Sequence, residues 1–401
     1  MTLLSALNST IEKHKEVLEN PSIPWSLLYT MEPPIEFLNL VEELKKNPSY
    51  SIFNEHLQML GGGGTSNNYL GLAFWLFKRS GQVESTEAIQ NLDDYLMMDT
   101  IPLMHIMLLG RVHIDADYTF QNGVKLHGIH NIPNRDVMSQ LSVGLLGGSA
   151  PFPDIDAILS IEYRQVKFHT SNLETEMEPF PRVNLPIQEL EDVRRCLALA
   201  RPIDYGIHSV GHLTIAPDHL PFPHSNSDWS VTPFKSPPMS PPVLEIEMSH
   251  ANSLLGSIYG RGIEFRNKLA IPADKLNGYS SGASSVDKAI DLRICLESTL
   301  LQNKRAQKIR STLAKRAASF LGEEVKMPRK QIEKIIKDAY DRTSAAVHTG
   351  ILPEKGYQNM ELAAKLVKQV IIKMINEGIP NWEQYEENPT MWENLKRRLC
   401  T

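Results

Sequence analysis

The last third of the chain carries the pattern that most restricts its fold: four consecutive stretches have apolar residues three and four positions apart. This spacing places the apolar residues on one side of an α-helix, so each stretch predicts an amphipathic helix. Glycines follow three of the stretches at positions where helices commonly end. Because the connections are short, we expect the helices to pack antiparallel in a bundle. The predicted helices cover Ser285–Gln302, Ala306–Leu321, Pro328–Val347 and Met360–Glu377, and the glycines are Gly322, Gly350 and Gly378.

The first 250 residues have a different pattern, in which β-branched and aromatic residues partly alternate with polar ones. Asn122-Gly123 lies between two such runs and predicts a β-hairpin. Ala157–His169 and Ile207–Ile215 are further strand candidates, whereas Leu190–Ala200 has helical spacing. These features favour a part of the chain that mixes helices with antiparallel strands.

A proline-rich stretch separates the two patterns, with eight prolines between positions 217 and 242. Such a stretch is typical of a connector, because proline cannot donate a backbone hydrogen bond. We therefore predict an α+β protein. A mixed α/β domain with antiparallel strands would cover residues 1–250, and an all-α helical bundle would cover residues 251–401.

The composition excludes several classes of protein. Of the 401 residues, 42% are hydrophobic and 22% are charged, which is typical of a folded soluble chain. Cys196, Cys295 and Cys400 lie far apart, which excludes a disulfide scaffold and fits a reducing cytoplasm. The first residues lack the pattern of a signal peptide, and no apolar stretch approaches the ~20 residues of a membrane span. We expect a cytoplasmic protein without a membrane partner.

Arg342 and His348, near the end of the third predicted helix, are residue types suited to RNA cleavage without a metal. The ribose 2′-OH is the nucleophile, imidazole exchanges protons near neutral pH, and a guanidinium stabilises charge on the phosphorus transition state. The spacing alone is not specific, because Arg164–His169 and Arg201–His208 show similar spacing in strand-like or turn-like segments. Only its helical setting distinguishes the pair Arg342 and His348 from these two segments.

Three segments of the predicted bundle resemble the C-terminal HEPN domain of the ApeA-like group of bacterial proteins in order, spacing and helical setting. Asp287–Ser298 is similar to the family's opening helix, and Leu313–Gly322 to its second helix, with an internal arginine. Tyr340–Gly350 is similar to its Arg-x(4–6)-His signature. The resemblance implies a metal-independent endoribonuclease that dimerises and places two Arg/His pairs in one shared cleft. It also implies a role in phage defence or as a toxin, with tRNA or mRNA as substrate.

On the matching positions, the resemblance makes Arg342 and His348 the catalytic pair. It implies RNA and a second copy of the chain as partners, with no cofactor and no metal. The supporting candidates are Glu297 and Arg316, expected to face the cleft, together with Asp341, Thr343 and Ser344.

Charge supports an RNA partner. Residues 301–350 contain twelve lysines and arginines against five acidic residues, a local net charge of +7 in a chain whose net charge is −6. Phosphate attraction needs such a patch, although a solvated helix face could have the same composition. The RNA-binding candidates are Lys315, Arg329, Lys330 and Lys334.

A non-catalytic nucleotide- or nucleic-acid-binding HEPN scaffold is the second interpretation. Five residues separate Arg342 from His348, and six positions on an ideal helix rotate by about 600°, so the two side chains point about 120° apart. Convergence would need the length of Arg342, a local bulge or contribution across a dimer axis.

A metal hydrolase is the third interpretation, because five potential metal ligands lie close together in the sequence. Nearby glycines favour a strand or turn there, so a shared helical face is not expected. The potential metal ligands are His208, His212, Asp218, His219 and His224.

A latent RNase also needs a trigger. We assign recognition of a phage component or small molecule to residues 1–250.

Overall fold

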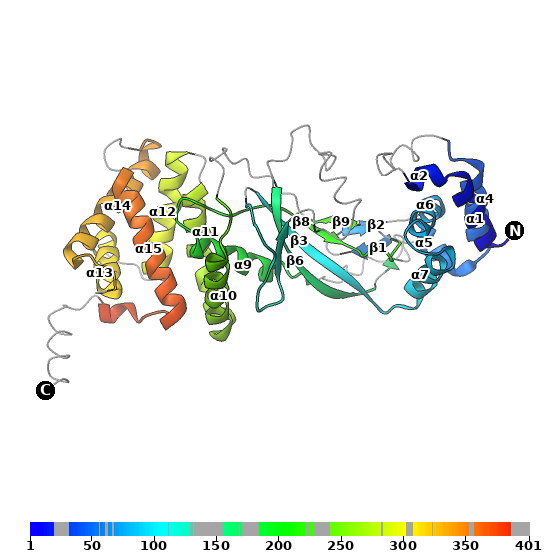
Figure 1. Ribbon diagram of the computed structural model, residues 1–401. Helices are drawn as coiled ribbons and strands as arrows, with labels where there is room; N and C mark the ends of the chain where they lie inside the picture. Colours follow the sequence, from blue (N-terminus) through cyan, green and yellow to red (C-terminus); the bar gives the residue numbers. More distant parts are fainter. Residues whose placement is uncertain are drawn as a thin grey trace.

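The computed structural model arranges the chain along one long axis (Figure 1). N-terminal helices lie at one end, a β-sheet lies in the middle, and C-terminal helices form the other end. The structure describes residues 1–19, 32–55, 57–60, 63–65, 68–110, 112–128, 131, 155–167, 169–170, 184–221, 224–227, 241–281, 284–301, 308–322, 324–352 and 357–385.

The N-terminal helices pack around aromatic side chains. Phe37 lies against Phe74 and Phe77, with ring centroids 4.4 and 5.2 Å apart. Asn68 begins one of these helices by accepting a hydrogen bond from the backbone N–H of Gly71 at 2.8 Å, as an N-cap residue does. The elements are α1 (Leu3–Lys13), α2 (Lys15–Glu19), α4 (Ile35–Lys45), η1 (Pro48–Tyr50), α5 (Ser51–Glu55), α6 (Tyr69–Ser80) and α7 (Ser85–Met97).

Of the described strands, six form one antiparallel sheet in the order β4-β5-β6-β3-β8-β9. Three further short strands pair separately in the order β2-β1-β7. The large sheet contains β3 (Thr100–Gly110), β4 (Tyr118–Thr119), β5 (Lys125–Gly128), β6 (Ile155–Val166), β8 (His208–Ile215) and β9 (His224–Ser227). The small sheet contains β1 (Leu57–Leu60), β2 (Gly63–Thr65) and β7 (His169–Thr170).

The predicted hairpin is confirmed. β4 and β5 pair directly across a turn in which Gly123 has a φ of 84°, a conformation that favours glycine. The backbone N–H of Gly123 donates to Phe120 O at 2.9 Å, and Phe120 N–H donates to Val124 O at 2.8 Å. The strand candidates at Ala157–His169 and Ile207–Ile215 correspond to β6 and β8, although β6 ends at Val166.

All four predicted C-terminal helices are present, so the α+β fold is confirmed. Gly350 ends α14 in the left-handed conformation, with a φ of 68°, as the sequence predicts. The helices are α10 (Glu245–Gly260), α11 (Ile263–Ser281), α12 (Ser285–Leu300), α13 (Ile309–Leu321), α14 (Arg329–Thr349) and α15 (Tyr357–Glu377), followed by η3 (Trp382–Tyr385).

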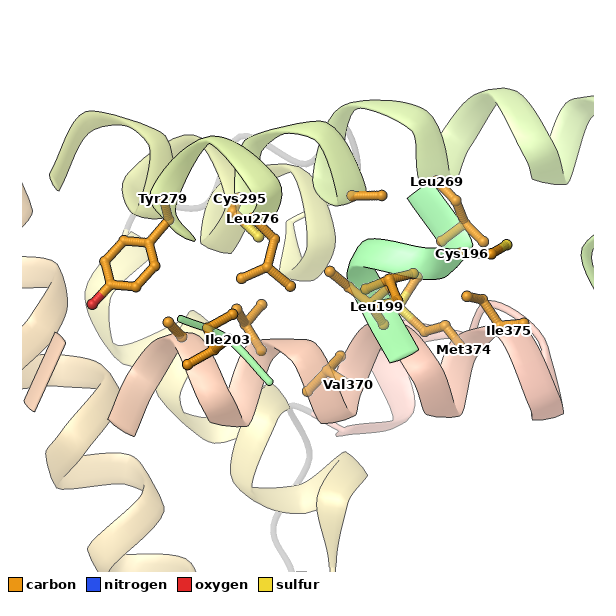
Figure 2. Packing of buried hydrophobic residues seen from close by; sticks show 14 of the residues in the cluster. Cys196, Leu199, Ile203, Leu269, Leu276, Tyr279, Cys295, Val370, Met374 and Ile375 are labelled. Atoms are coloured by element: carbon orange, nitrogen blue, oxygen red, sulfur yellow. The ribbon is translucent and has the colours of Figure 1, made fainter. Parts of the chain in front are cut away.

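The predicted helix at Leu190–Ala200 is α9 (Ile187–Ala200), and it packs inside the C-terminal helices. Figure 2 shows Cys196 and Leu199 of α9 between Leu269 of α11 and Met374 of α15. One continuous apolar core joins these helices to the sheet. The packing therefore does not break near residue 250, because a helix from before that position lies in the core of the bundle.

Buried ion pairs fasten α9 to α11. The carboxylate of Asp192, only 3% exposed, lies 3.2 Å from Arg195 Nη1 and 3.0 Å from Arg266 Nε. Asp274 of α11 in turn contacts Arg194 at 2.5 Å and Arg195 at 2.8 Å. Because buried charges need such partners, this network fixes how the two helices face each other.

Asn277 ties α11 to the segment that leads into β8. Its side chain accepts a hydrogen bond from the backbone N–H of Ile207 at 2.8 Å and donates one to Ile207 O at 2.7 Å. Both backbone groups lie in the interior, where an unpaired one would cost free energy. The sheet and the helices are thus joined by polar contacts as well as by apolar packing.

Every helix in the described ranges is too short or too polar to span a lipid bilayer.

We expect Asp192→Asn to lower the free energy of unfolding by about 3 kcal/mol, because it leaves two half-buried arginines with less compensating charge. Chemical denaturation followed by circular dichroism measures this value. The matched control is Glu361→Gln, which removes a surface carboxylate paired with Lys365 on α15 and should change stability little. Equal stability of the Asp192 variant and the wild type would contradict the role given to the network.

Candidate functional site

The segment with the Arg/His signature lies on α14, an unbroken α-helix from Arg329 to Thr349. Pro328 precedes its first turn, where the missing N–H costs no helical hydrogen bond. At the other end, Gly350 N–H donates to Ala346 O at 2.9 Å. The local bulge that would have brought Arg342 and His348 together is absent from this stretch.

Arg342 and His348 lie on different sides of α14. His348 is exposed in the last turn, whereas Arg342 is half-buried and its Nη1 is buried without a hydrogen-bond partner within the described residues. Six positions of regular helix separate the side chains by about 9 Å along the axis and about 120° around it. The regular helix removes the bulge as a route to convergence and leaves the length of Arg342 or a contribution across a dimer axis, so the pairing stays a prediction.

Arg316 was expected at the cleft, but it lies inside the bundle with 0% exposure. Its Nη1 donates to Leu300 O at 2.5 Å and to Leu301 O at 3.3 Å, at the end of α12. The guanidinium also lies 5.7 Å from the ring of Trp382. Arg316 is thus a structural residue that pairs the last carbonyls of α12, which would otherwise lack partners.

Thr343 and Asp341 also have local roles. Thr343 is fully buried and its hydroxyl donates to Tyr340 O at 3.0 Å. Asp341 is half-exposed and lies 2.7 Å from Arg310 Nη2 of α13, which links the two helices at the surface.

A polar cluster that the sequence prediction captured only in part joins α12 to α14. We call it the α12–α14 polar cluster: Arg293, Glu297, Tyr340 and Ser344. Arg293 Nε donates to Glu297 Oε1 at 3.0 Å, and Tyr340 Oη donates to the same oxygen at 3.0 Å. Arg293 Nη1 lies 3.5 Å from Ser344 Oγ, and its guanidinium lies 5.4 Å from the Tyr340 ring. The predicted residues Glu297 and Ser344 therefore meet through Arg293.

Burial and charge in the α12–α14 polar cluster set the protonation of Tyr340 and the position of the Arg293–Glu297 ion pair. Burial, reinforced by the Glu297 carboxylate, raises the pKa of the Tyr340 hydroxyl, which therefore stays protonated and donates. Arg293 is 21% exposed and Glu297 is 32% exposed, so the ion pair lies at the edge of the interior. One feature of the sequence could have predicted this ion pair: Arg293 and Glu297 are four residues apart, which places both on one face of a helix.

His348 follows Ser344 by one helical turn, so the two residues share a face of α14. Val347 and Ile351, exposed at 43% and 70%, lie beside His348 in the sequence. The C-terminal end of α14 thus presents an imidazole between a polar cluster and exposed apolar side chains.

The four RNA-binding candidates are all exposed, but they lie away from His348. Arg329, Lys330 and Lys334 occupy the first two turns of α14, about 20–30 Å along the axis from His348. Lys330 is five turns from His348 and faces the same side. Lys315 lies on the neighbouring helix α13. The basic residues and the imidazole could therefore contact different parts of one strand of RNA.

The histidine cluster does not assemble a metal site in the part of the chain that the structure covers, where no group of three potential ligands lies together. His208 and His212 are four residues apart on β8, about 13 Å along the strand. His212 instead stacks on His105, with ring centroids 5.4 Å apart. Burial, with His212 beside it, lowers the pKa of His105 to about 3, so His105 is neutral. The metal-hydrolase interpretation has no supporting geometry there.

A cavity of about 420 Å³ lies at one end of the sheet. Met104 and Ile215 contribute apolar side chains to its lining, and the charged residues Glu162, Arg164 and Asp218 also border it. This is the N-terminal half of the chain, to which the sequence prediction assigned recognition of a trigger.

No model of a known protein family matches this chain, and neither does any curated protein or solved structure.

Substitutions of Arg316 and His348, both predicted site residues, should change the stability of the protein by different amounts. Arg316→Ala should lower the free energy of unfolding by about 3 kcal/mol, because buried carbonyls lose their partner. His348→Ala should leave stability nearly unchanged, because the side chain is exposed. Urea titrations of both variants measure these changes. Equal stability of the two variants would contradict the structural role of Arg316.

Proposed function

We propose that the protein is a metal-independent endoribonuclease of the HEPN type, acting on cytoplasmic RNA in phage defence or as a toxin. The observation that carries this proposal is the position of His348, which is exposed one turn from the α12–α14 polar cluster. The segments that resemble the HEPN family also pack together, since α14 contacts both α12 and α13. The substrate class is RNA, and tRNA or mRNA follows from the resemblance alone.

The chemistry requires no external nucleophile. The 2′ oxygen attacks the adjacent phosphorus, the bond from phosphorus to the 5′ oxygen breaks, and a 2′,3′-cyclic phosphate forms. His348 accepts the 2′ proton, and the departing 5′ oxygen takes a proton from solvent. A guanidinium offsets the negative charge that develops on the phosphoryl oxygens.

A second copy of the chain is the expected partner. Arg342 and His348 diverge on one helix, so a shared cleft would combine Arg342 with His348 of the partner subunit. Exposed Val347 and Ile351 beside His348 are apolar side chains that such a contact would remove from water.

A non-catalytic RNA-binding scaffold is the second candidate. The divergence of Arg342 and His348 on an unbroken helix favours it, because the two side chains leave the helix about 120° apart. RNA binding that survives the double change Arg342→Ala and His348→Ala, without cleavage products, would support the scaffold.

We also propose that the N-terminal half recognises the trigger of the ribonuclease. The cavity lined by Met104, Ile215 and neighbouring charged side chains supports a small molecule as the trigger. A phage component is the other candidate.

Purified wild-type protein should cleave mixed RNA in EDTA, and His348→Ala should lower the rate by about 100- to 10,000-fold because proton transfer is lost. Gel electrophoresis of end-labelled RNA measures the rate. The matched control is His250→Ala, which removes another exposed helical histidine, on α10, and should keep the wild-type rate. Equal cleavage by wild type and His348→Ala would remove His348 from the mechanism.

Binding of single-stranded RNA should depend on salt through the basic residues of α14. Each of Lys330→Ala and Lys334→Ala should reduce the slope of log affinity against log salt by about 0.7, because one phosphate contact is lost. Fluorescence anisotropy at several salt concentrations measures the slope. Lys365→Ala, an exposed lysine on α15, is the control and should leave it unchanged. An unchanged slope in both α14 variants would exclude these lysines from the RNA contact.

A further inference from the structure

We propose that Arg293 of α12 supplies the guanidinium that binds the scissile phosphate beside His348. This inference rests on the proposed ribonuclease function and changes which arginine acts with the histidine. The signature in the sequence favours Arg342, whereas the packing of α12 on α14 brings Arg293 to the face that carries His348.

The position of Arg293 follows from its contact with Ser344. Its Nη1 lies 3.5 Å from Ser344 Oγ, and His348 follows Ser344 by four residues. Residues with this spacing have Cβ atoms about 5–6 Å apart, and helical side chains lean toward the N-terminus of their helix. The Cα–Cβ bond of His348 is therefore tilted toward Ser344, and a phosphate at Ser344 would have the guanidinium on one side and the imidazole on the other.

The guanidinium is held in place before any ligand binds. Glu297 accepts from Nε at 3.0 Å, and the Tyr340 ring lies 5.4 Å from the guanidinium carbon. Tyr340 also donates to Glu297 at 3.0 Å, which fixes the carboxylate that orients Arg293. An ordered donor group loses little entropy when it binds a phosphate, and this makes the arrangement suitable for stabilising a transition state.

Arg293 keeps donors for a ligand. A guanidinium has five N–H groups, and the cluster offers it the Glu297 carboxylate and the hydroxyls of Ser344 and Tyr340. Its side chain is 21% exposed, so a phosphate can approach from solvent. Arg342, by contrast, has Nη1 buried and lies about 120° around the helix from His348.

The test compares full-length wild type, Arg293→Lys and His348→Ala in RNA cleavage in EDTA. We expect Arg293→Lys to lose about 100-fold in kcat with a smaller change in KM, because lysine keeps the charge but not the planar set of donors. The matched control is Arg261→Lys, an exposed arginine at the end of α10 that donates to Ile375 O and lies 5.4 Å from the Phe265 ring, and it should keep the wild-type rate. Thermal unfolding by circular dichroism checks that each variant is folded.

Arg293→Ala adds a readout that a purely structural arginine would not change in the same way. Low, non-denaturing concentrations of guanidinium should restore part of its activity, and should not restore that of His348→Ala. Wild-type rates in folded Arg293→Lys and Arg293→Ala, with His348→Ala inactive, would overturn the role of Arg293 and leave the proposed function standing.

If the wild type itself does not cleave RNA, the proposed ribonuclease function fails, and binding then decides the role of Arg293. The probe is a fluorescein-labelled single-stranded RNA, measured by anisotropy. Weaker binding by Arg293→Ala than by wild type would support a phosphate contact at this residue. Equal affinity, or no binding by the wild type, would overturn the role of Arg293.

Discussion

One strand, β3, contributes to both apolar cores of the described chain, and the arrangement of the other elements depends on it. Ile101 and Leu103 pack with the N-terminal helices, whereas Met107 and Leu109, further along the same strand, pack with the core that continues into the C-terminal helices. Alternate residues of a strand share a face, so one face of β3 serves both cores. His105 lies between the two groups, fully buried and neutral.

The position of α14 follows from this strand through α9. β3 and β6 support α9, the ion pairs of Asp192 and Asp274 attach α9 to α11, and α11 packs on α12. α12 then carries Arg293 and Glu297 to the surface of α14. The α12–α14 polar cluster is thus set by a chain of contacts that begins in the sheet, more than a hundred residues earlier in the sequence.

Local patterns predicted the elements well, because helical spacing, a glycine at a helix end and Asn122-Gly123 at a turn depend on neighbouring residues alone. The place of α9 could not be predicted in this way, since its partners α11 and α15 are distant in sequence. Arg316 was misplaced for a related reason: arginines are mostly exposed, and only the approach of the α12 carbonyls explains its burial.

In the candidate site too, local features were predicted from the sequence and contacts between helices were not. The exposure of His348 agrees with its position near a helix end, and Glu297 and Ser344 do lie in one cluster. Arg293 was missed as a site residue because its contact with Ser344 exists only once α12 and α14 pack. Spacing on one helix relates Arg342 to His348, but it cannot show that an arginine of the neighbouring helix α12 contacts Ser344, one turn before His348.

The first turn of α14 has a consequence for the effect of salt. Arg329 and Lys330 occupy the end of the helix where the peptide dipoles leave partial positive charge, so like charges meet there. Dissolved ions screen that repulsion and favour the helix in the free protein. The same ions compete with any RNA phosphate that would neutralise the two side chains. Salt would therefore act in opposite directions on the order of this turn and on the RNA binding proposed for it.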